Sequence, residues 1–440
     1  MPIQGRAAVI STMVVVSALA MTGASPAMAA KKPLTLLVPV TMKADTDAWT
    51  RVCTEFTKEN KGIPVKLMAV PWENDLLYFQ QYITMATAGV APDVLLLLPN
   101  WVPNFADSNV IEDLTPWAKR TGVKLSEWTD AGIASAAWRG RQWGIPGGPS
   151  SDFWVQFNRQ VIAESGVVDP GTLFEQRNWN WDTMEMIMSK TSRFNGNKCV
   201  RIGLDQMGDL WSIAPWVWGM GGQVLNEDGT ACMLGEPAAI EAISKIHNLI
   251  FGKKIMGLAW HNYGLDHIAS AQKSQFAMTA WWSTLGMFFI SQKVSWPVDM
   301  VPFPAGPKSA RTNVAEVLSL AMSRQSKQKE AAWKFLQFAG GTRGQIILLE
   351  DLQALPTRKD LTKRLGETYR KANMLSAAAS VDDAFARQRI EDRSPKMHLA
   401  MPKILAAYDK IWSGKAEVAT TLKDAARAAT AELARVTKRK

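Results

Sequence analysis

Short apolar runs alternate with amphipathic stretches over the first part of the chain. Residues 34–38 have the length and composition of a buried strand, and residues 45–60 carry apolar side chains at helical spacing. Two further strand-like runs, 64–70 and 92–98, flank a second helical stretch at 75–88. This order of strand, helix, strand, helix, strand is typical of a parallel sheet with crossover helices. The sequence therefore predicts an α/β fold.

The remaining chain repeats this alternation less regularly. Strands are predicted at 153–157, 275–280, 298–301 and 318–322, and helices at 182–192, 237–251, 327–338, 344–350 and from about Pro402 onward. We find no internal repeat. At roughly 150 residues per domain, a chain of 440 residues predicts two or three domains.

The N-terminus has the features of a secretory signal peptide. Residues 1–29 carry a single charge, Arg6, which an apolar run at 7–21 follows. An A-x-A sequence at 27–29 predicts cleavage near Ala29. The apolar run is shorter than the roughly 20 residues that span a bilayer. We therefore expect an exported, periplasmic protein, with a retained membrane anchor as the alternative.

The amino-acid composition excludes several classes of protein. With 47% hydrophobic and 20% charged residues, the chain is neither disordered nor a coiled coil. The formal net charge is +10, but the one dense basic block is at 438–440, so we expect no nucleic-acid partner. The 19 Trp against 5 Tyr lead us to expect aromatic rings exposed in a cleft or at an interface.

The sequence contains no recognisable motif for catalysis or metal binding. The three cysteines form no CxxC motif and no His/Cys cluster, so no metal site is predicted. No GxSxG, HExxH, GxGxxG or phosphate-loop pattern is present, and we expect no cofactor and no enzyme activity. The acidic pairs at 382–383 and 391–392 are interpreted as solvated surface. A secreted glycoside hydrolase, with two carboxylates in a cleft, is the alternative function.

Several short motifs, taken in order, resemble one protein family. They are Ala91-Pro92-Asp93-Val94, Trp143-Gly144-Ile145-Pro146, Phe157-Asn158-Arg159, Trp179-Asn180-Trp181-Asp182, the glycine-rich stretch 219–230, Phe276-Ala277-Met278, Val301-Pro302-Phe303-Pro304, the stretch 329–336 and Leu355-Pro356-Thr357. Their order and spacing, together with the signal peptide, resemble the extracellular solute-binding proteins of bacterial ABC transporters. The resemblance is to the carbohydrate-binding group that includes maltose-binding protein.

The resemblance implies a two-lobe periplasmic-binding-protein fold with a hinge and an interlobe ligand cleft. Lobe one would contain residues 31–148 plus 297–340, and lobe two residues 149–296 plus 341–440. The implied function is to bind a sugar or oligosaccharide between the lobes and to deliver it to a membrane permease. A monomer is expected, and closure on the ligand is the implied mechanism.

Candidate ligand contacts lie on loops that follow predicted strands, since ligands of open α/β sheets bind at the carboxyl ends of strands. A sugar needs flat aromatic rings for its C–H face and polar side chains for its hydroxyl groups. The candidates are Lys43, Asp45, Asn100, Trp101, Ser151, Asp152, Asp209, Trp211, Trp281 and Trp282. Trp282 is the preferred stacking ring. The alternatives are a helix cap for Asp45, hinge capping for Ser151 and Asp152, and core packing for the tryptophans.

One disulfide is expected in an oxidising compartment. The implied lobes place Cys199 and Cys232 together in lobe two, so we predict that these two residues are bonded. Cys53 lies on the apolar face of the first helix and is predicted to be buried and free.

Overall fold

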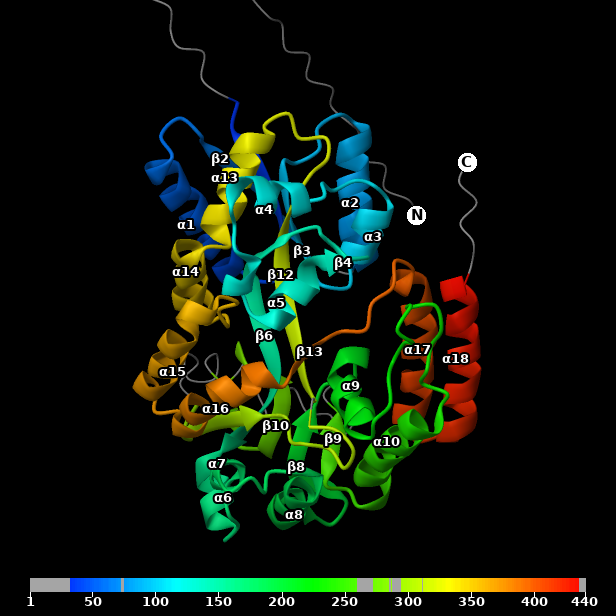
Figure 1. Cartoon of the computed structure of the whole chain (residues 1–440). Helices are drawn as coiled ribbons and strands as arrows, with labels where there is room; N and C mark the ends of the chain where they lie inside the picture. The colour runs from blue at the N-terminus through cyan, green and yellow to red at the C-terminus, as the bar shows by residue number, and fades with distance from the viewer. Residues whose placement is uncertain are drawn as a thin grey trace, which may run out of the picture. The chain divides into compact units, whose positions relative to one another are not determined.

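The computed structural model describes residues 32–72, 75–258, 272–284, 286, 294–310 and 312–434. The predicted signal peptide lies outside these residues. Within the unit 33–440, a sheet of 11 strands runs through two lobes with separate hydrophobic cores. Helices cover the sheet in both lobes, so the predicted α/β class is confirmed (Figure 1).

Lobe one begins with the predicted parallel unit. Strand β1 pairs in parallel with β2 and β3, and β12 continues the sheet in the antiparallel direction. The strands of this lobe are β1 (Leu34–Val40), β2 (Val65–Pro71), β3 (Val94–Leu97) and the hairpin β4 (Ala137–Trp138) and β5 (Arg141–Gln142). Its helices are α1 (Lys43–Glu59), α2 (Asp75–Thr87), α3 (Val102–Asp107), α4 (Thr115–Thr121), α5 (Asp130–Ala136), α13 (Lys329–Ala339) and α14 (Thr342–Leu352), with a 3-10 turn at Leu125–Glu127.

Lobe two contains the second half of the sheet and the C-terminal helices. Its strands are β7 (Arg193–Asn195), β8 (Lys198–Gln206), β9 (Met256–Leu258), β10 (Phe276–Trp282) and β11 (Val298–Pro302). Its helices are α6 (Arg159–Glu164), α7 (Pro170–Glu175), α8 (Trp181–Thr191), α9 (Leu210–Gly219), α10 (Pro237–His247), α15 (Thr362–Lys371), α16 (Leu375–Ala386), α17 (Met397–Trp412) and α18 (Val418–Ala434), with turns at Asn248–Gly252 and Lys359–Leu361.

Three strands form the connection between the lobes. β6 (Ile145–Asn158) pairs with β12 (Asn313–Met322) as far as Asp152 and with β10 from Phe153 onward. The short strand β13 (Gln388–Ile390) pairs with the first residues of β12. The chain thus leaves lobe one in the middle of a single long strand, between Asp152 and Phe153, a few residues after the expected boundary at 148–149.

Two expected lobe boundaries need correction. Residues 297–302 were placed in lobe one, but β11 pairs with the lobe-two half of β6, and the chain returns through β12. Residues 341–352 were placed in lobe two, but Ile347 and Leu348 of α14 pack into the lobe-one core. The last crossing follows α14, where Leu355 N donates to Ser150 O at 2.8 Å.

Most of the described tryptophans are core residues, contrary to the expectation from their number. Fully buried rings include Trp49, Trp154 and Trp216, whereas Trp72 is 43% exposed. Several of the buried indole N–H groups donate to buried acceptors. Trp179 Nε1, for example, donates to Pro302 O at 2.9 Å. By contrast, no hydrogen-bond partner among the described residues is found for the indole N–H groups of Trp101, Trp154, Trp181, Trp211 and Trp218.

The predicted disulfide is not formed, because all three cysteines are free. Cys199, on β8, packs beside the cluster that contains Trp154, whereas Cys232 belongs to the main lobe-two core. The backbone of Cys232 is held elsewhere, through its N–H bond to Thr430 Oγ1 at 3.0 Å. Cys53 is buried and free, as predicted.

Candidate functional site

The loop after β3 presents the first pair of candidates. Trp101 stacks on Tyr78 of α2 with ring centroids 4.6 Å apart, and Tyr78 donates its hydroxyl to Leu96 O at 2.9 Å. Pro103 at the start of α3 suits a first helical turn, because that turn has no use for its missing N–H. Asn100 precedes this helix and is 8% exposed. The strand end and the proline therefore fix Asn100 and Trp101 at the edge of lobe one.

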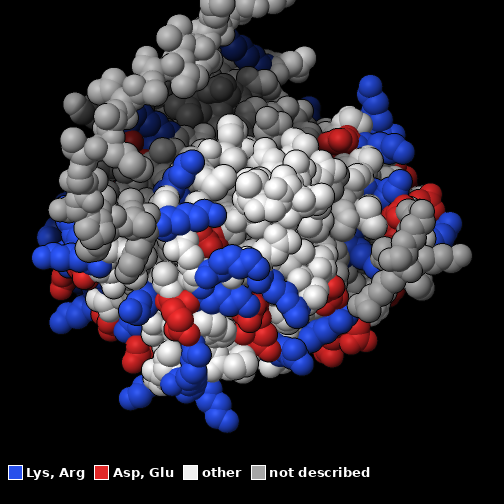
Figure 2. All heavy atoms as spheres, turned by 90° about the horizontal axis from the view of Figure 1, so that it is seen from above, with Lys and Arg blue, Asp and Glu red and all other residues white. Residues whose placement is uncertain are grey.

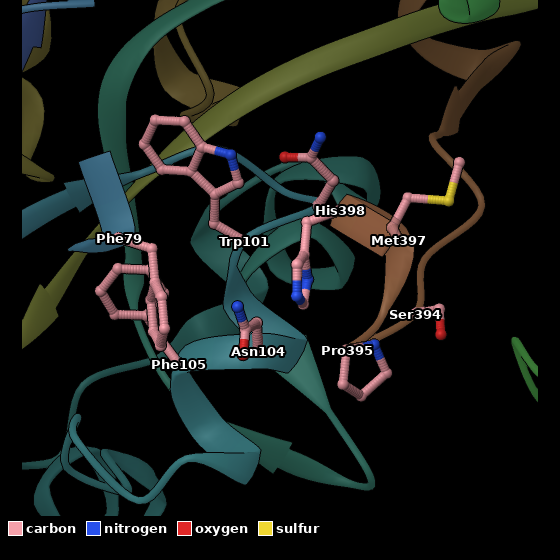
Figure 3. A pocket seen from close by; sticks show the side chains of 9 residues that line it. Phe79, Trp101, Asn104, Phe105, Ser394, Pro395, Met397 and His398 are labelled. Carbon is pink, nitrogen blue, oxygen red and sulfur yellow. The ribbon is translucent and has the colours of Figure 1, made fainter. Parts of the chain in front are cut away.

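Residues from both lobes meet at these two side chains. We use the name rim pocket for the pocket that lobe-one residues form with the segment that leads into α17 (Figure 3). It is lined by Phe79, Asn100, Trp101, Asn104 and Phe105 of lobe one and by Ser394, Pro395, Met397 and His398 of lobe two. Aromatic rings, two amides and an imidazole are thus combined in one interlobe pocket.

A second group of candidates lies at the crossing of the three connecting strands. Asp152 is 0% exposed and accepts bonds from Asn313 Nδ2 at 2.9 Å and from Gln388 Nε2 at 2.9 and 3.0 Å. Burial raises the pKa of Asp152 to about 7, although these amide bonds favour its charged form. Ser151 Oγ lies 3.3 Å from Ser283 Oγ. Asp152 thus holds β6, β12 and β13 together, as the hinge alternative proposed.

The two tryptophans at the end of β10 lie next to this crossing. Trp281 and Trp282 are half-buried, and both backbone carbonyls accept bonds from Gln156 Nε2, at 3.4 and 3.2 Å. The ring of Trp282 meets Phe153 edge to face, with centroids 5.8 Å apart. Trp282 is therefore partly exposed, while its backbone and one edge of its ring are held by Gln156 and Phe153. This arrangement is suitable for stacking against a ligand.

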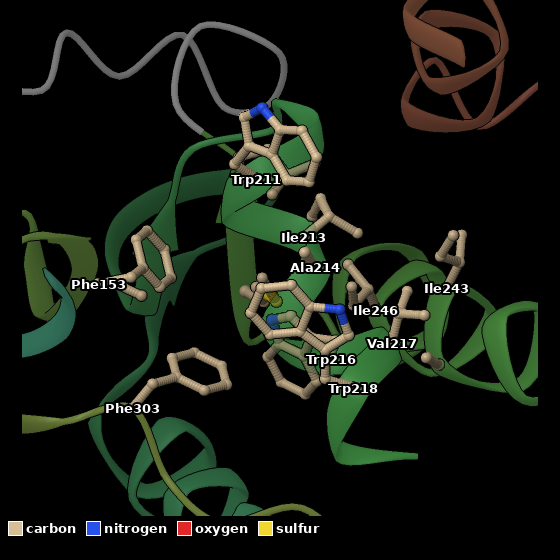
Figure 4. Packing of buried hydrophobic residues seen from close by; sticks show 14 of the residues in the cluster. Phe153, Trp211, Ile213, Ala214, Trp216, Val217, Trp218, Ile243, Ile246 and Phe303 are labelled. Carbon is tan, nitrogen blue, oxygen red and sulfur yellow. The ribbon is translucent and has the colours of Figure 1, made fainter. Parts of the chain in front are cut away.

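Asp209 and Trp211 stand where β8 leads into α9. Asp209 caps this helix, since its Oδ1 accepts from Trp211 N at 2.9 Å and from Ser212 N at 3.1 Å. Trp211 is 7% exposed, and its ring lies apart from those of Trp216 and Trp218, which face the core near Phe303 (Figure 4). The Asp209 carboxylate is therefore a cap, while Trp211 occupies the edge of the lobe-two core.

Lys43 and Asp45 make local contacts at the start of α1. Lys43 Nζ pairs with Asp47 at 2.5 Å, and both side chains are exposed. Asp45 Oδ2 accepts bonds from Thr41 N at 2.7 Å and Met42 N at 3.1 Å. The helix-cap alternative for Asp45 is therefore correct, and no described contact brings this pair to the rim pocket or the hinge.

Sequence reasoning missed the segment between β13 and α17. Arg389 stacks on Trp218 at 4.3 Å and pairs with Asp392 at 2.9 Å, and Asp392 also accepts from Val224 N at 2.8 Å. Glu391 is buried as well, so the 391–392 pair was wrongly interpreted as solvated surface, whereas Asp382 and Asp383 are exposed as predicted. The sequence signal for this segment was the dipeptide Ser394-Pro395, which indicates a loop between a strand and a long helix.

His398 also lines the rim pocket, where its ring lies between Asn104 and Pro395 (Figure 3). Among the described residues, no group of three or more His, Cys, Asp and Glu side chains could hold a metal ion. Within the same ranges, no helix is long and apolar enough to cross a membrane.

The surface charge is mixed on the face seen from above. Lysines and arginines alternate there with aspartates and glutamates, beside an uncharged area (Figure 2). On this face the net charge of +10 is not gathered into a single basic patch.

Comparison with known proteins gives a family match over most of the chain. The family described as bacterial extracellular solute-binding protein matches residues 42–346. A Brucella abortus protein, named only as a binding protein, is 23% identical over 392 residues, which cover 86% of this chain and 88% of that protein. A Brucella suis protein of the same description matches equally.

Solved structures share the fold at low sequence identity. An ABC substrate-binding protein of Listeria monocytogenes in complex with cycloalternan has a TM-score of 0.76 at 19% identity, covering 90% of this chain and 97% of that one. The sugar-binding protein MalE of Xanthomonas citri also has 0.76, at 15% identity, covering 92% and 98%. UgpB of Mycobacterium tuberculosis in complex with glycerophosphocholine has 0.73 at 20% identity, covering 92% and 98%.

Proposed function

The chain belongs to the family of bacterial extracellular solute-binding proteins, and from this premise we propose that it binds a sugar or oligosaccharide between its lobes for import by an ABC transporter. The observation that carries the proposal is the rim pocket, which Trp101 and Asn100 of lobe one and His398 of lobe two line together. Aromatic rings contact the apolar face of a sugar, while amides and imidazole bind its hydroxyl groups.

The proposed mechanism is ligand-induced closure. A ligand that contacts both lobes binds the closed state better than the open state and shifts the population toward closure. The closed protein would then dock on a membrane permease. We further propose that the chain acts as a monomer in the periplasm after removal of residues 1–29.

The ligand contacts are assigned to two regions. Asn100, Trp101 and His398 would hold one end of the ligand in the rim pocket, and Ser151, Trp281 and Trp282 would contact it near the hinge. Trp211 would add a ring from lobe two. Several structural neighbours support a sugar, since they are complexes with cycloalternan, maltose and acarbose. Another neighbour is a complex with glycerophosphocholine.

Binding without bond cleavage fits the carboxylates better than hydrolysis does. A glycosidase needs one carboxylic acid and one carboxylate flanking the bond that breaks. Of the predicted candidates, Asp152 is bound by two amides at 0% exposure and Asp209 caps a helix. Both acids are thus engaged in structural contacts, which favours a binding protein.

A sugar library tests the proposal. We expect at least one mono- or oligosaccharide to raise the melting temperature and to change Trp emission, and chromatography to recover it intact. ATP and duplex DNA should change neither signal. A sugar that binds and is then cleaved would favour the hydrolase, and a screen in which only a nucleotide or DNA binds would overturn the transport function.

A matched pair of variants locates the binding site. Asn104→Ala removes an amide of the rim pocket, and we expect it to weaken sugar binding by about 1 kcal/mol, the typical net value of a hydrogen bond. Asn197→Ala changes an exposed residue of the turn between β7 and β8 and should leave affinity unchanged. Equal affinities of the two variants would place the ligand outside the rim pocket.

A further inference from the structure

One hydrogen-bond donor of the rim pocket has no acceptor. Trp101 lines this pocket and is 4% exposed, yet its Nε1–H donates to no acceptor among the described residues. A buried donor without an acceptor costs free energy, because it has lost its hydrogen bond to water. In Figure 3 the nitrogen lies on the edge of the indole that is turned toward His398. The unsatisfied donor therefore faces the lobe-two side of the pocket.

Four other buried indole N–H groups lack a partner too, but none of these tryptophans lines the rim pocket. They pack within hydrophobic clusters that do not include Trp101, and they are Trp154, Trp181, Trp211 and Trp218. An unsatisfied donor inside a core only lowers stability. One that lines a pocket can be satisfied by an acceptor on an incoming molecule, so Trp101 is the indole that a ligand can complete.

The N–H group is also what Trp101 has to offer a ligand, since its ring face is already in use. Tyr78 covers one face of the indole, with ring centroids 4.6 Å apart and planes inclined by 23°. With only 4% of the side chain exposed, little ring area remains for stacking on a sugar. A contact with Trp101 would therefore be made at the edge that carries the nitrogen.

The rim pocket admits only a small and uncharged group. Its volume is about 20 Å³, and a cavity needs roughly 10–15 Å³ to hold one water molecule. No Lys, Arg, Asp or Glu side chain is among the described residues that line it. An anion enclosed there would lose its hydration without gaining a counter-charge. A single neutral hydroxyl group satisfies both limits.

We propose that the rim pocket encloses one hydroxyl group of the sugar, whose oxygen accepts the hydrogen bond of Trp101 Nε1, and that this contact selects neutral sugars with a hydroxyl group at that position. This inference rests on the proposed function and specifies its substrate class. Because the N–H is buried, the hydroxyl group would enter while the lobes are apart and be enclosed as they close. The amide oxygen of Asn104, in the same pocket, can accept the hydroxyl hydrogen.

Deoxy sugars test this contact on the unchanged protein. Titration calorimetry would compare D-glucose and D-galactose with their 2-, 3-, 4- and 6-deoxy analogues. We expect the loss of one particular hydroxyl group to weaken binding roughly 5- to 100-fold, because the buried donor is then left unsatisfied in the complex. A phosphate ester at the same position should bind no better than the deoxy analogue, since the pocket supplies no counter-charge.

A matched pair of variants assigns the effect to the indole nitrogen. Trp101→Phe keeps an aromatic ring without the N–H, and the affinity ratio between the hexose and its deoxy analogue should fall close to 1. Trp181→Phe removes an equally unpartnered N–H from the lobe-two core and should leave this ratio unchanged. Each ratio is measured within one variant, so a change in stability does not affect the comparison.

The outcomes separate this inference from the function on which it rests. If a hexose binds and all of its deoxy analogues bind equally well, the inference is overturned and the sugar-binding function stands. The same holds if Trp101→Phe retains the ratio of the unchanged protein, since another residue then holds the hydroxyl group. If neither hexose binds although an oligosaccharide does, recognition of one hydroxyl group on a single ring is wrong. If no sugar binds at all, the proposed function itself fails.

Discussion

Asp152 combines complete burial with two amide partners, and it forms no ion pair with any residue that the structure describes. Its position at the crossing of β6, β12 and β13 explains this arrangement, because Asn313 and Gln388 approach from the other two strands. Amides compensate only part of the cost of removing a carboxylate from water, so burial dominates and raises its pKa to about 7. The ionisation state of one residue is therefore coupled to the interlobe connection.

This coupling predicts a pH dependence of stability. Since the folded pKa of about 7 exceeds the ordinary value of 3.8, the folded protein binds this proton more tightly than the unfolded chain. The contribution of Asp152 is complete below about pH 4 and is lost as pH rises through about 7. We expect the free energy of unfolding of Asp152→Asn, relative to the unchanged protein, to increase between pH 5 and 8.

Urea denaturation at several pH values measures this difference. Comparing the two proteins removes the opposite trend of residues such as Glu185, whose pKa is lowered by Lys245 and Lys253 despite burial. A difference that stays constant from pH 5 to 8 would contradict the assignment.

Two tryptophans of lobe two should respond differently to truncation. Trp282 is half-buried at the end of β10, and we expect Trp282→Ala to weaken sugar binding by about 1–3 kcal/mol, the scale of an aromatic contact. Trp216 is fully buried and donates to Gln206 Oε1 at 3.1 Å, so Trp216→Ala should cost about 3–5 kcal/mol of stability. Measuring sugar affinity and chemical denaturation on both variants distinguishes the two roles. An unchanged affinity of Trp282→Ala would show that the Trp282 ring packs in the core and does not contact the ligand.

Residues of the candidate site could be predicted from the sequence where they directly follow a recognisable strand. Asn100 and Trp101 follow an apolar strand directly, and the structure places both in the rim pocket. His398 is isolated in sequence, and its neighbours across the pocket, such as Asn100 and Asn104, are about 300 residues away, so no spacing rule points to it. The capping role of Asp209 was equally hidden, since a helix-capping acid and a ligand-binding acid have the same sequence signature; for Asp45 the same ambiguity left a helix cap as the alternative.

At the scale of elements, amphipathic helices and short buried strands were predictable. Helix α1 and strands β1 to β3 lie close to their predicted positions because local periodicity determines them. Strand β6 was recognised only at 153–157, since Pro146, Gly147 and Gly148 are unfavourable in an isolated strand. Tertiary pairing with β12 overrides that preference. The strand therefore begins well before its apolar part.

The glycines of β6 make a second element-scale prediction. A Cβ atom on Gly147 would lie 2.6 Å from Gly340 Cα, so the close approach of α13 to the strand requires glycine there. Gly147→Ala should destabilise the protein by about 1–3 kcal/mol through overpacking. Gly366→Ala, within α15 and with no atom closer than 3.6 Å, should be neutral or stabilising by up to about 1 kcal/mol. Chemical denaturation compares the two, and equal effects would contradict the packing argument.

For the whole molecule, the two cores share one sheet. β6 contributes backbone pairs to both lobes, and Asp152, Asn313 and Gln388 link the three connecting strands by side chains. Such a connection allows lobe closure by small changes at a few residues, while unfolding of one lobe removes strand partners from the other. The lobes are thus expected to unfold together even though their cores are separate.

The last prediction follows from this coupling. Thermal unfolding should give one transition, and a bound sugar should raise it without splitting it. At a ligand concentration 100 times its dissociation constant, binding to the native state alone adds about 2.7 kcal/mol. For a chain of this size that amounts to a shift of roughly 1–4 °C. Calorimetry with and without the sugar measures it, and Asn104→Ala should reduce the shift at equal ligand concentration. Two transitions, of which only one moves with the ligand, would show that the sugar contacts a single lobe and would refute binding between them.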